Sequence, residues 1–203
     1  MKNRYTMPAL TLALVAMLAA CSGETTTVET DTNVNQTDTQ PTTDLTATDT
    51  AATTMNTGSL SAEDGAFVNK AAMGGLAEVQ YGNLALQKAQ SEDVKSFAQK
   101  MVTDHGAANQ ELQALAGSKG MTLPTELTGT HKAGYDHLNM LSGAEFDKAY
   151  MQHMVADHEA DIAEFEKAAN SATDSELKAF ASKTLPTLQQ HKQLADETSK
   201  KVQ

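Results

Sequence analysis

The chain has 203 residues, with 26 acidic and 15 basic side chains and a formal net charge of −11 at neutral pH. This acidity argues against nucleic acid as a partner. Only one cysteine occurs, so no intramolecular disulfide can form, and the hydrophobic core must supply the stability of the fold.

The first twenty residues have the pattern of a signal peptide. Two basic residues precede an apolar run over 7–20, which is too short to span a bilayer comfortably. The run ends in Leu18-Ala19-Ala20-Cys21, which resembles the lipobox of bacterial lipoproteins, where cleavage precedes a cysteine that carries lipid. We therefore expect residues 1–20 to be removed and Cys21 to anchor the protein in a membrane through acyl chains. The alternative is an ordinary secretory peptide that contains a cysteine.

Residues 21–60 are rich in threonine and acidic side chains. They contain no aromatic residue, and no lysine or arginine occurs between Arg4 and Lys70. Such a segment cannot bury enough apolar surface to offset the entropy of an ordered chain. We expect a disordered tether that follows the lipidated cysteine and connects it to a folded domain over residues 61–203.

Four capping signals divide this domain into helices. Serine or threonine followed three residues later by an acid begins three of the segments, at Ser61, Ser142 and Thr173, and Ser91 with two first-turn acids begins another. Each precedes apolar residues at helical spacing, and no strand pattern competes. The sequence predicts long helices over 62–89, 92–118, 143–169 and 174–199, with a shorter helix within 125–141.

A nine-residue segment occurs twice. Residues 97–105, Phe-Ala-Gln-Lys-Met-Val-Thr-Asp-His, return as residues 150–158, Tyr-Met-Gln-His-Met-Val-Ala-Asp-His. The repeat predicts two related helical hairpins, and it puts His105 and His158 at similar heights in two helices.

One polar residue lies on the core-facing side of each long helix. Glu78, His105, His158 and His191 all fall on apolar stripes of their helices. A rise of 1.5 Å per residue places all four in the middle third of the helices. A carboxylate and three imidazoles suit a transition-metal ion such as Zn, Fe or Cu. The alternative is a buried polar network in which the histidines bind Glu78, a tyrosine hydroxyl or water.

Other polar residues carry weaker signals. The di-iron enzymes with helical bundles use Glu-x-x-His motifs, and no acidic residue stands three positions before any of the six histidines. Asp104 and Asp157 are adjacent to His105 and His158, about 100° around the helix, so they cannot easily share a metal ion with these histidines. We expect the two aspartates to pair with lysines or to cap a neighbouring contact. The acidic residues 159, 161, 164 and 166 read as a solvated face, and His131 and His137 read as exposed.

The chain resembles an uncharacterised family of bacterial envelope lipoproteins, a domain of unknown function assigned to the ferritin-like group. The resemblance covers residues 64–196. It rests on Phe97-Ala98, Met101 to His105, Leu123-Pro124, Phe146-Asp147 with Tyr150, Met154 to His158, Leu177-Lys178, Phe180-Ala181, Leu185-Pro186 and His191. It implies an all-α, ferritin-like four-helix bundle with a long connection between the second and third helices, and it brings no established activity.

These observations lead to one functional expectation and two rivals. We expect an outer-membrane lipoprotein of the bacterial cell envelope, with its folded domain in the periplasm or at the surface. In the lipoproteins that this chain resembles, a residue other than aspartate after the lipidated cysteine directs the protein to the outer membrane, and here that residue is Ser22. Its expected role is a non-enzymatic binding or stress-related module, and Glu78, His105, His158 and His191 are its candidate metal ligands. The rivals are a helical interaction scaffold with purely structural histidines and a metal-dependent oxidoreductase.

Overall fold

The computed structural model describes residues 60–203 as an all-helical domain of five helices. They are α1 (Ala62–Lys88), α2 (Glu92–Ser118), α3 (Gly129–Met140), α4 (Gly143–Ser171) and α5 (Ser175–Lys201). The four predicted long helices and the short helix in the connection are confirmed, with bounds within two residues. The predicted signal peptide, Cys21 and all but the last residue of the tether lie outside the described residues.

The helix ends follow local chemistry. Ser61 caps α1 as predicted, because its hydroxyl accepts a hydrogen bond from the Asp64 amide at 3.0 Å. The predicted start of the last helix is wrong by one residue: Asp174, not Thr173, is the cap, and its carboxylate accepts from the amides of Glu176 and Leu177. Beyond α2, Gly120 has a φ of 74°, a left-handed conformation that glycine adopts without steric cost.

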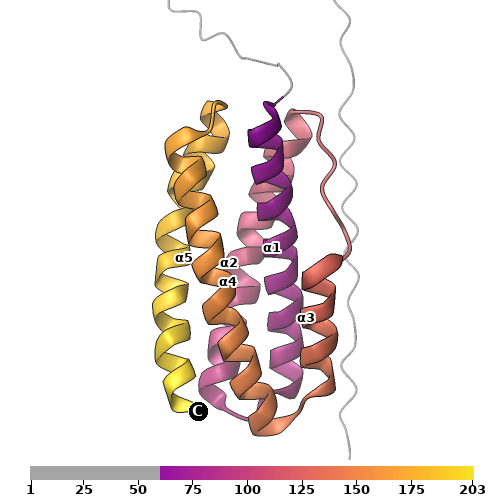
Figure 1. The fold of residues 1–203 in the computed structure, drawn as a ribbon, viewed down its shortest axis with the longest axis vertical. Coiled ribbons are helices and arrows are strands. Elements are labelled where there is room, and N and C mark those ends of the chain that lie inside the picture. The colour runs from indigo at the N-terminus through magenta and orange to yellow at the C-terminus, as the bar shows by residue number, and fades with distance from the viewer. Residues whose placement is uncertain (1–59) are drawn as a thin grey trace, which may run out of the picture. The chain divides into compact units, whose positions relative to one another are not determined.

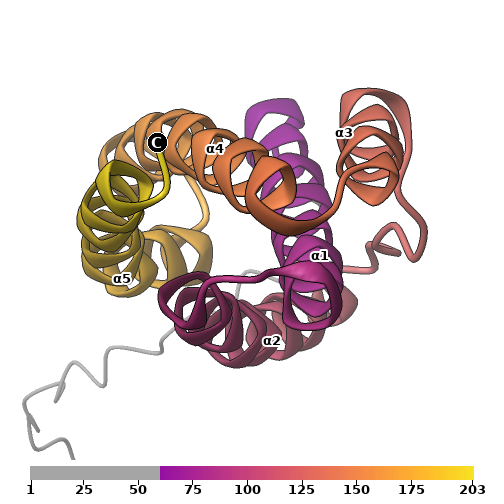
Figure 2. The same cartoon turned by 90° about the horizontal axis from the view of Figure 1, so that it is seen from below.

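The long helices pair as two hairpins, α1 with α2 and α4 with α5 (Figure 1). Viewed from below, the four lie around a common centre, and α3 lies outside them against α1 (Figure 2). The connection that carries α3 runs along the bundle, so α2 and α4 point the same way (Figure 1). Each long helix therefore turns one face toward the shared interior.

Two buried aspartates hold the hairpins together. Asp64 of α1 accepts hydrogen bonds from the Thr173 hydroxyl and from the amides of Thr173 and Asp174, in the α4–α5 loop. Asp147 of α4 accepts from the amides of Gln90 and Ser91, in the α1–α2 loop, at 3.0 and 2.8 Å. In each hairpin, a carboxylate of the first helix thus accepts hydrogen bonds from the backbone amides in the loop of the other hairpin. The repeated segments, residues 97–105 and 150–158, lie on α2 and α4. Because α2 is the second helix of its hairpin and α4 is the first of the other, the two segments do not occupy equivalent hairpin positions.

The hydrophobic core consists of two clusters. One contains Tyr81, Phe97, Met101, Tyr150 and Met154 among its members, and the other contains Phe67, Leu112, Phe165, Phe180 and Leu188. The glycines of α1 allow close approach, since a Cβ on Gly75 would lie 2.0 Å from Asn109 Oδ1 of α2. Among residues 60–203, none of the helices combines the length and apolar character that a membrane crossing needs.

Candidate metal centre

The four predicted inward residues all lie in the interior, one on each long helix. Glu78, His105, His158 and His191 are exposed by only 1, 5, 0 and 0%. On their own helices they lie between residues of the two hydrophobic clusters: Phe67 and Tyr81 flank Glu78 in α1, and Met154 and Phe165 flank His158 in α4. The helix stripes placed these side chains correctly. Whether the group binds a metal ion stays a prediction.

The three imidazole rings form a compact triangle. Their centroids are 5.6 Å apart for His105 and His158, 5.2 Å for His105 and His191, and 5.4 Å for His158 and His191. One ring nitrogen from each lies within 4.8 Å of the others. Ligand atoms around a tetrahedral zinc ion lie about 3.3 Å apart, so the three ring nitrogens would have to move closer to one another to bind one ion.

Neighbouring groups fix the orientation of two rings. His158 Nδ1 lies 2.9 Å from the Met154 carbonyl oxygen, and His191 Nε2 lies 2.8 Å from Asp104 Oδ2. Because a carbonyl and a carboxylate only accept hydrogen bonds, both of these nitrogens carry a proton. His158 Nε2 and His191 Nδ1 therefore present lone pairs, and both are buried without a hydrogen-bond partner. Carbonyl or carboxylate groups hold metal-binding histidines in the same way in known sites.

Burial keeps the histidines neutral. It lowers the pKa of His105 to about 4, against the raising influence of Asp104. It lowers the pKa of His191 to about 4 as well, although the hydrogen bond to Asp104 raises it, and it also lowers the pKa of His158. Neutral imidazole is the form that binds metal ions, so at neutral pH no ligand proton has to be displaced from these rings.

Glu78 is the least satisfied group of this layer. Its Oε2 lies 2.7 Å from His105 Nδ1 and its Oε1 lies 3.3 Å from His158 Nδ1. Both contacts are close, but neither is aligned as a hydrogen bond, and both oxygens lack a partner. Burial raises the pKa of Glu78 to about 7, while His158 acts to lower it. A cation beside this carboxylate would stabilise its ionised form.

The layer as a whole leaves five buried polar atoms without hydrogen bonds. They are Glu78 Oε1 and Oε2, His105 Nε2, His158 Nε2 and His191 Nδ1. The buried tyrosines do not supply the missing partners: Tyr81 donates its hydroxyl to the His131 carbonyl at 2.8 Å, and the Tyr150 hydroxyl is itself unpartnered. Each unsatisfied buried atom costs about 1–3 kcal/mol. Such a concentration of unpartnered buried atoms, which includes the lone pairs of His158 Nε2 and His191 Nδ1, suits a ligand that accepts lone pairs.

The family comparison matches residues 49–198 to the domain of unknown function DUF4142. The chain belongs to this family. Among solved structures, it is similar to the crystal structure of a DUF305 fragment from Deinococcus radiodurans, with a TM-score of 0.63 and 13% sequence identity. That match covers 70% of this chain and 99% of the other, and at this identity it shows the fold alone. No curated protein matches the chain.

Two acidic residues of the DUF4142 domain differ from their predicted roles. Asp104 pairs with Lys100 at 2.8 Å, as expected, but it also orients His191 across the helix interface. Burial alone would raise the pKa of Asp104, yet hydrogen bonds from Lys100 and His191 bring it below its usual value. Asp157, for which a lysine or a neighbouring contact was expected, contacts His153 at 3.2 Å.

The predicted solvated face of α4 is only partly correct. Glu159 and Glu166 are exposed, but Asp161 and Glu164 are half-buried and line a cavity. Burial raises the pKa of Asp161 well above its usual value, and neighbouring carboxylates reinforce that rise. The spacing His158-x-x-Asp161 places both residues on one face of the helix, and it could have predicted that Asp161 is partly buried.

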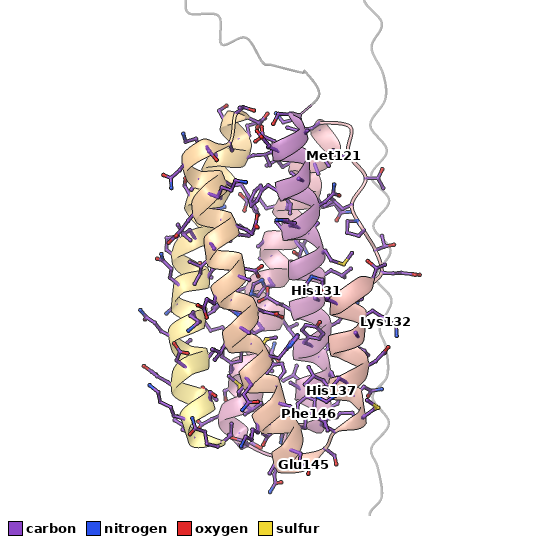
Figure 3. All side chains as sticks on the ribbon, viewed as in Figure 1. Met121, His131, Lys132, His137, Glu145 and Phe146 are labelled. Atoms are coloured by element: carbon purple, nitrogen blue, oxygen red, sulfur yellow. The ribbon has the colours of Figure 1, made fainter. Side chains whose placement is uncertain are left out.

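The two histidines of α3 also differ from each other. His137 is exposed, as predicted. His131 is half-buried and lines the same cavity as Asp161, so the expectation of an exposed side chain is wrong for it. Figure 3 shows His131 at the start of α3, near mid-height of the bundle, and His137 nearer its lower end. Neither belongs to the group of three convergent histidines.

Proposed function

We propose that this protein binds one transition-metal ion, of the Zn, Fe or Cu class, through His105, His158, His191 and Glu78. The observation that carries the proposal is the set of five buried polar atoms in one layer that have no hydrogen-bond partner. A purely structural network satisfies its own hydrogen bonds, because an unsatisfied one is worse than an apolar core. Here the ring protons of His158 and His191 are used by Met154 and Asp104, while the lone pairs remain unused.

The ligand set favours one ion and a binding role. Three neutral nitrogens and one carboxylate complete a four-coordinate shell, whereas catalytic zinc sites keep one position open for water or substrate. The absence of Glu-x-x-His among the six histidines argues against a di-iron centre. A closed site supports a non-enzymatic module that stores, buffers or senses metal. This is the reason to prefer it over a metal-dependent oxidoreductase.

The proposal includes a cellular location. Cys21 carries lipid at the outer membrane, and a disordered tether holds the domain in the periplasm or at the surface. The lipobox-like Leu18-Ala19-Ala20-Cys21 and the composition of residues 21–60 support this. The parallel α2 and α4, with the long connection between them, support a ferritin-like assignment of the bundle. Membership in DUF4142 is compatible with this reading.

Metal binding is tested by elemental analysis and calorimetry. Metal-free protein should take up one equivalent of Zn, Fe or Cu, and its melting temperature should rise by an amount that chelator reverses. Ligand at a hundred times its dissociation constant adds about 2.7 kcal/mol to the free energy of unfolding. His158→Ala should lose the ion, whereas His137→Ala removes an exposed histidine of α3 and should bind as the wild type does.

Two results would contradict the proposal. The first is a wild-type protein that takes up none of these metals and melts at the same temperature with and without chelator. In that case the histidines are structural, and the scaffold reading takes its place. The second is equal loss of metal from His158→Ala and His137→Ala, which would place binding outside the buried layer.

A further inference from the structure

A cavity between α1 and α4 leads toward the histidine layer. Its volume is about 420 Å³, and Asp157, Asp161 and Glu164 of α4 line it together with Gly74 and Glu78 of α1. Glu78 is 1% exposed, and neither of its oxygens has a hydrogen-bond partner. The cavity therefore ends at an unpartnered, buried carboxylate that also contacts His105 and His158.

A smaller void in the interior shares lining residues with this cavity. Its volume is about 20 Å³, which is enough for one water molecule or one ion. Glu78 and Asp161 line both spaces, and His105 lines the inner one. The two carboxylates thus stand where the outer cavity and the inner void meet.

The charge of the cavity suits a cation. Four carboxylates line it, those of Glu78, Asp157, Asp161 and Glu164, against one lysine. That lysine, Lys70, is paired with Glu164 at 2.6 Å. A cation that enters the cavity favours the ionised form of the carboxyl groups beside it, so these groups can serve as its ligands.

A second cavity reaches the layer from the opposite side, and its charge differs. It lies between α2 and α5, has a volume of about 300 Å³ and is lined by His105 and His191. Its Lys100 and Lys183 are paired with Asp104 and Glu111 at 2.8 and 2.7 Å. Two positive and two negative side chains balance there, so this side offers a cation no electrostatic attraction.

We propose that the α1–α4 cavity is the loading site for the divalent cation, and that Asp161 binds the ion before it passes by Glu78 to the histidines. The proposal rests on the metal-binding function proposed above. Carboxylate oxygen is a suitable ligand for a partly hydrated cation, which loses water before imidazole replaces it. Gly74 leaves room beside Asp161, because an added Cβ there would lie 3.4 Å from Asp161 Oδ1.

The test is the rate of metal loading. Metal-free, full-length protein is mixed rapidly with cobalt chloride at low ionic strength, and the visible absorption of nitrogen-bound Co(II) is followed. Asp161→Asn, which keeps the shape of the side chain, should lower the association rate constant about tenfold. The absorption spectrum at saturation should not change, because the histidine ligands are intact.

A second variant guards against misfolding. Gly74→Ala replaces a glycine within α1 by the best helix former, and the new methyl group makes an ordinary van der Waals contact. It should fold at least as stably as the wild type, yet slow the loading by narrowing the space beside Asp161. Circular dichroism confirms the folded state of each variant before the kinetic measurement.

Two controls each replace one carboxyl group by the matching amide. Glu159→Gln changes an exposed residue of α4 that lies outside both cavities, and Glu111→Gln changes a residue of the α2–α5 cavity. Both should load at the wild-type rate. Loading of Asp161→Asn at the wild-type rate, or equal slowing by Glu111→Gln, would overturn the loading site while the metal site stands. A wild-type protein that never develops the Co(II) absorption would overturn both.

Discussion

The raised pKa of Glu78 predicts that its replacement by glutamine stabilises the metal-free protein at high pH, although the replacement removes a candidate metal ligand. In the metal-free protein, burial raises this pKa from 4.5 to about 7. The folded state therefore keeps a proton between these pH values that the unfolded state has lost. Stability from this group is fully present below pH 4.5 and is lost as the pH rises through 7. Glu78→Gln, which resembles the protonated acid and cannot ionise, should not show this loss.

The size of the effect follows from the two pKa values. One pKa unit corresponds to 1.36 kcal/mol, so the rise from 4.5 to about 7 is worth about 3 kcal/mol when fully expressed. Between pH 5 and pH 8, the metal-free glutamine variant should gain about 2–3 kcal/mol relative to the wild type. Comparing the two proteins at each pH cancels the titration of the histidines, whose lowered pKa values act in the opposite direction.

The measurement is urea unfolding followed by helical circular dichroism, in the presence of chelator, at pH 5 and pH 8. Saturating zinc should reverse the order at pH 8, because the ionised Glu78 then has a cation beside it and glutamine is a poorer ligand. A stability difference that stays constant between the two pH values would refute the assignment of Glu78 as a buried, proton-retaining carboxyl group. A stability difference that changes with pH but is the same with and without zinc would support the titration of Glu78 and contradict the proposed metal binding.

Four further predictions test other parts of the molecule. Gly82→Ala should lower the free energy of unfolding by about 1–2 kcal/mol, because its Cβ would lie 2.8 Å from Val102 Cγ2 and 3.1 Å from the Ala98 carbonyl oxygen. Gly106→Ala, which meets nothing within 4 Å, should instead raise it by about 0.5–1 kcal/mol in the same urea titration. Asp147→Ala should cost about 2 kcal/mol or more, since two loop amides lose their acceptor; unchanged urea midpoints would contradict that role. Cys21→Ser should abolish acylation, and mass spectrometry that finds normal lipid on this variant would contradict the lipoprotein assignment.

Much of the fold could be predicted because it depends on local sequence patterns. Capping residues and apolar spacing gave the helix bounds to within two residues, and the recurrence of Met-Val-x-Asp-His gave the shared depth of His105 and His158. These signals depend only on rise and rotation along a single helix. For the same reason they could not say which hairpin positions the repeat would occupy.

Contacts between helices were beyond these patterns. Asp104 was not expected to share a metal ion with its neighbour His105, since adjacent residues point about 100° apart. That same rotation turns Asp104 toward α5, where His191 is placed by packing rather than by any feature of α2. Asp161 was misread for a similar reason, because its surroundings depend on how closely α1 approaches α4. The sequence thus predicted which polar residues lie in the interior, and the arrangement of the helices determines which groups they contact.

The arrangement also explains why one polar layer can persist inside an otherwise apolar bundle. The outer protons of His158 and His191 are bound by Met154 and Asp104, so these two rings cannot turn their lone pairs outward without breaking those hydrogen bonds. The unused acceptors are therefore held in the interior even in the metal-free state, at a cost in stability. Under the proposed function, a bound cation would remove that cost and favour the ionised form of Glu78. Part of the free energy of metal binding would then appear as stability of the fold, so the stability of the domain would depend on the supply of metal.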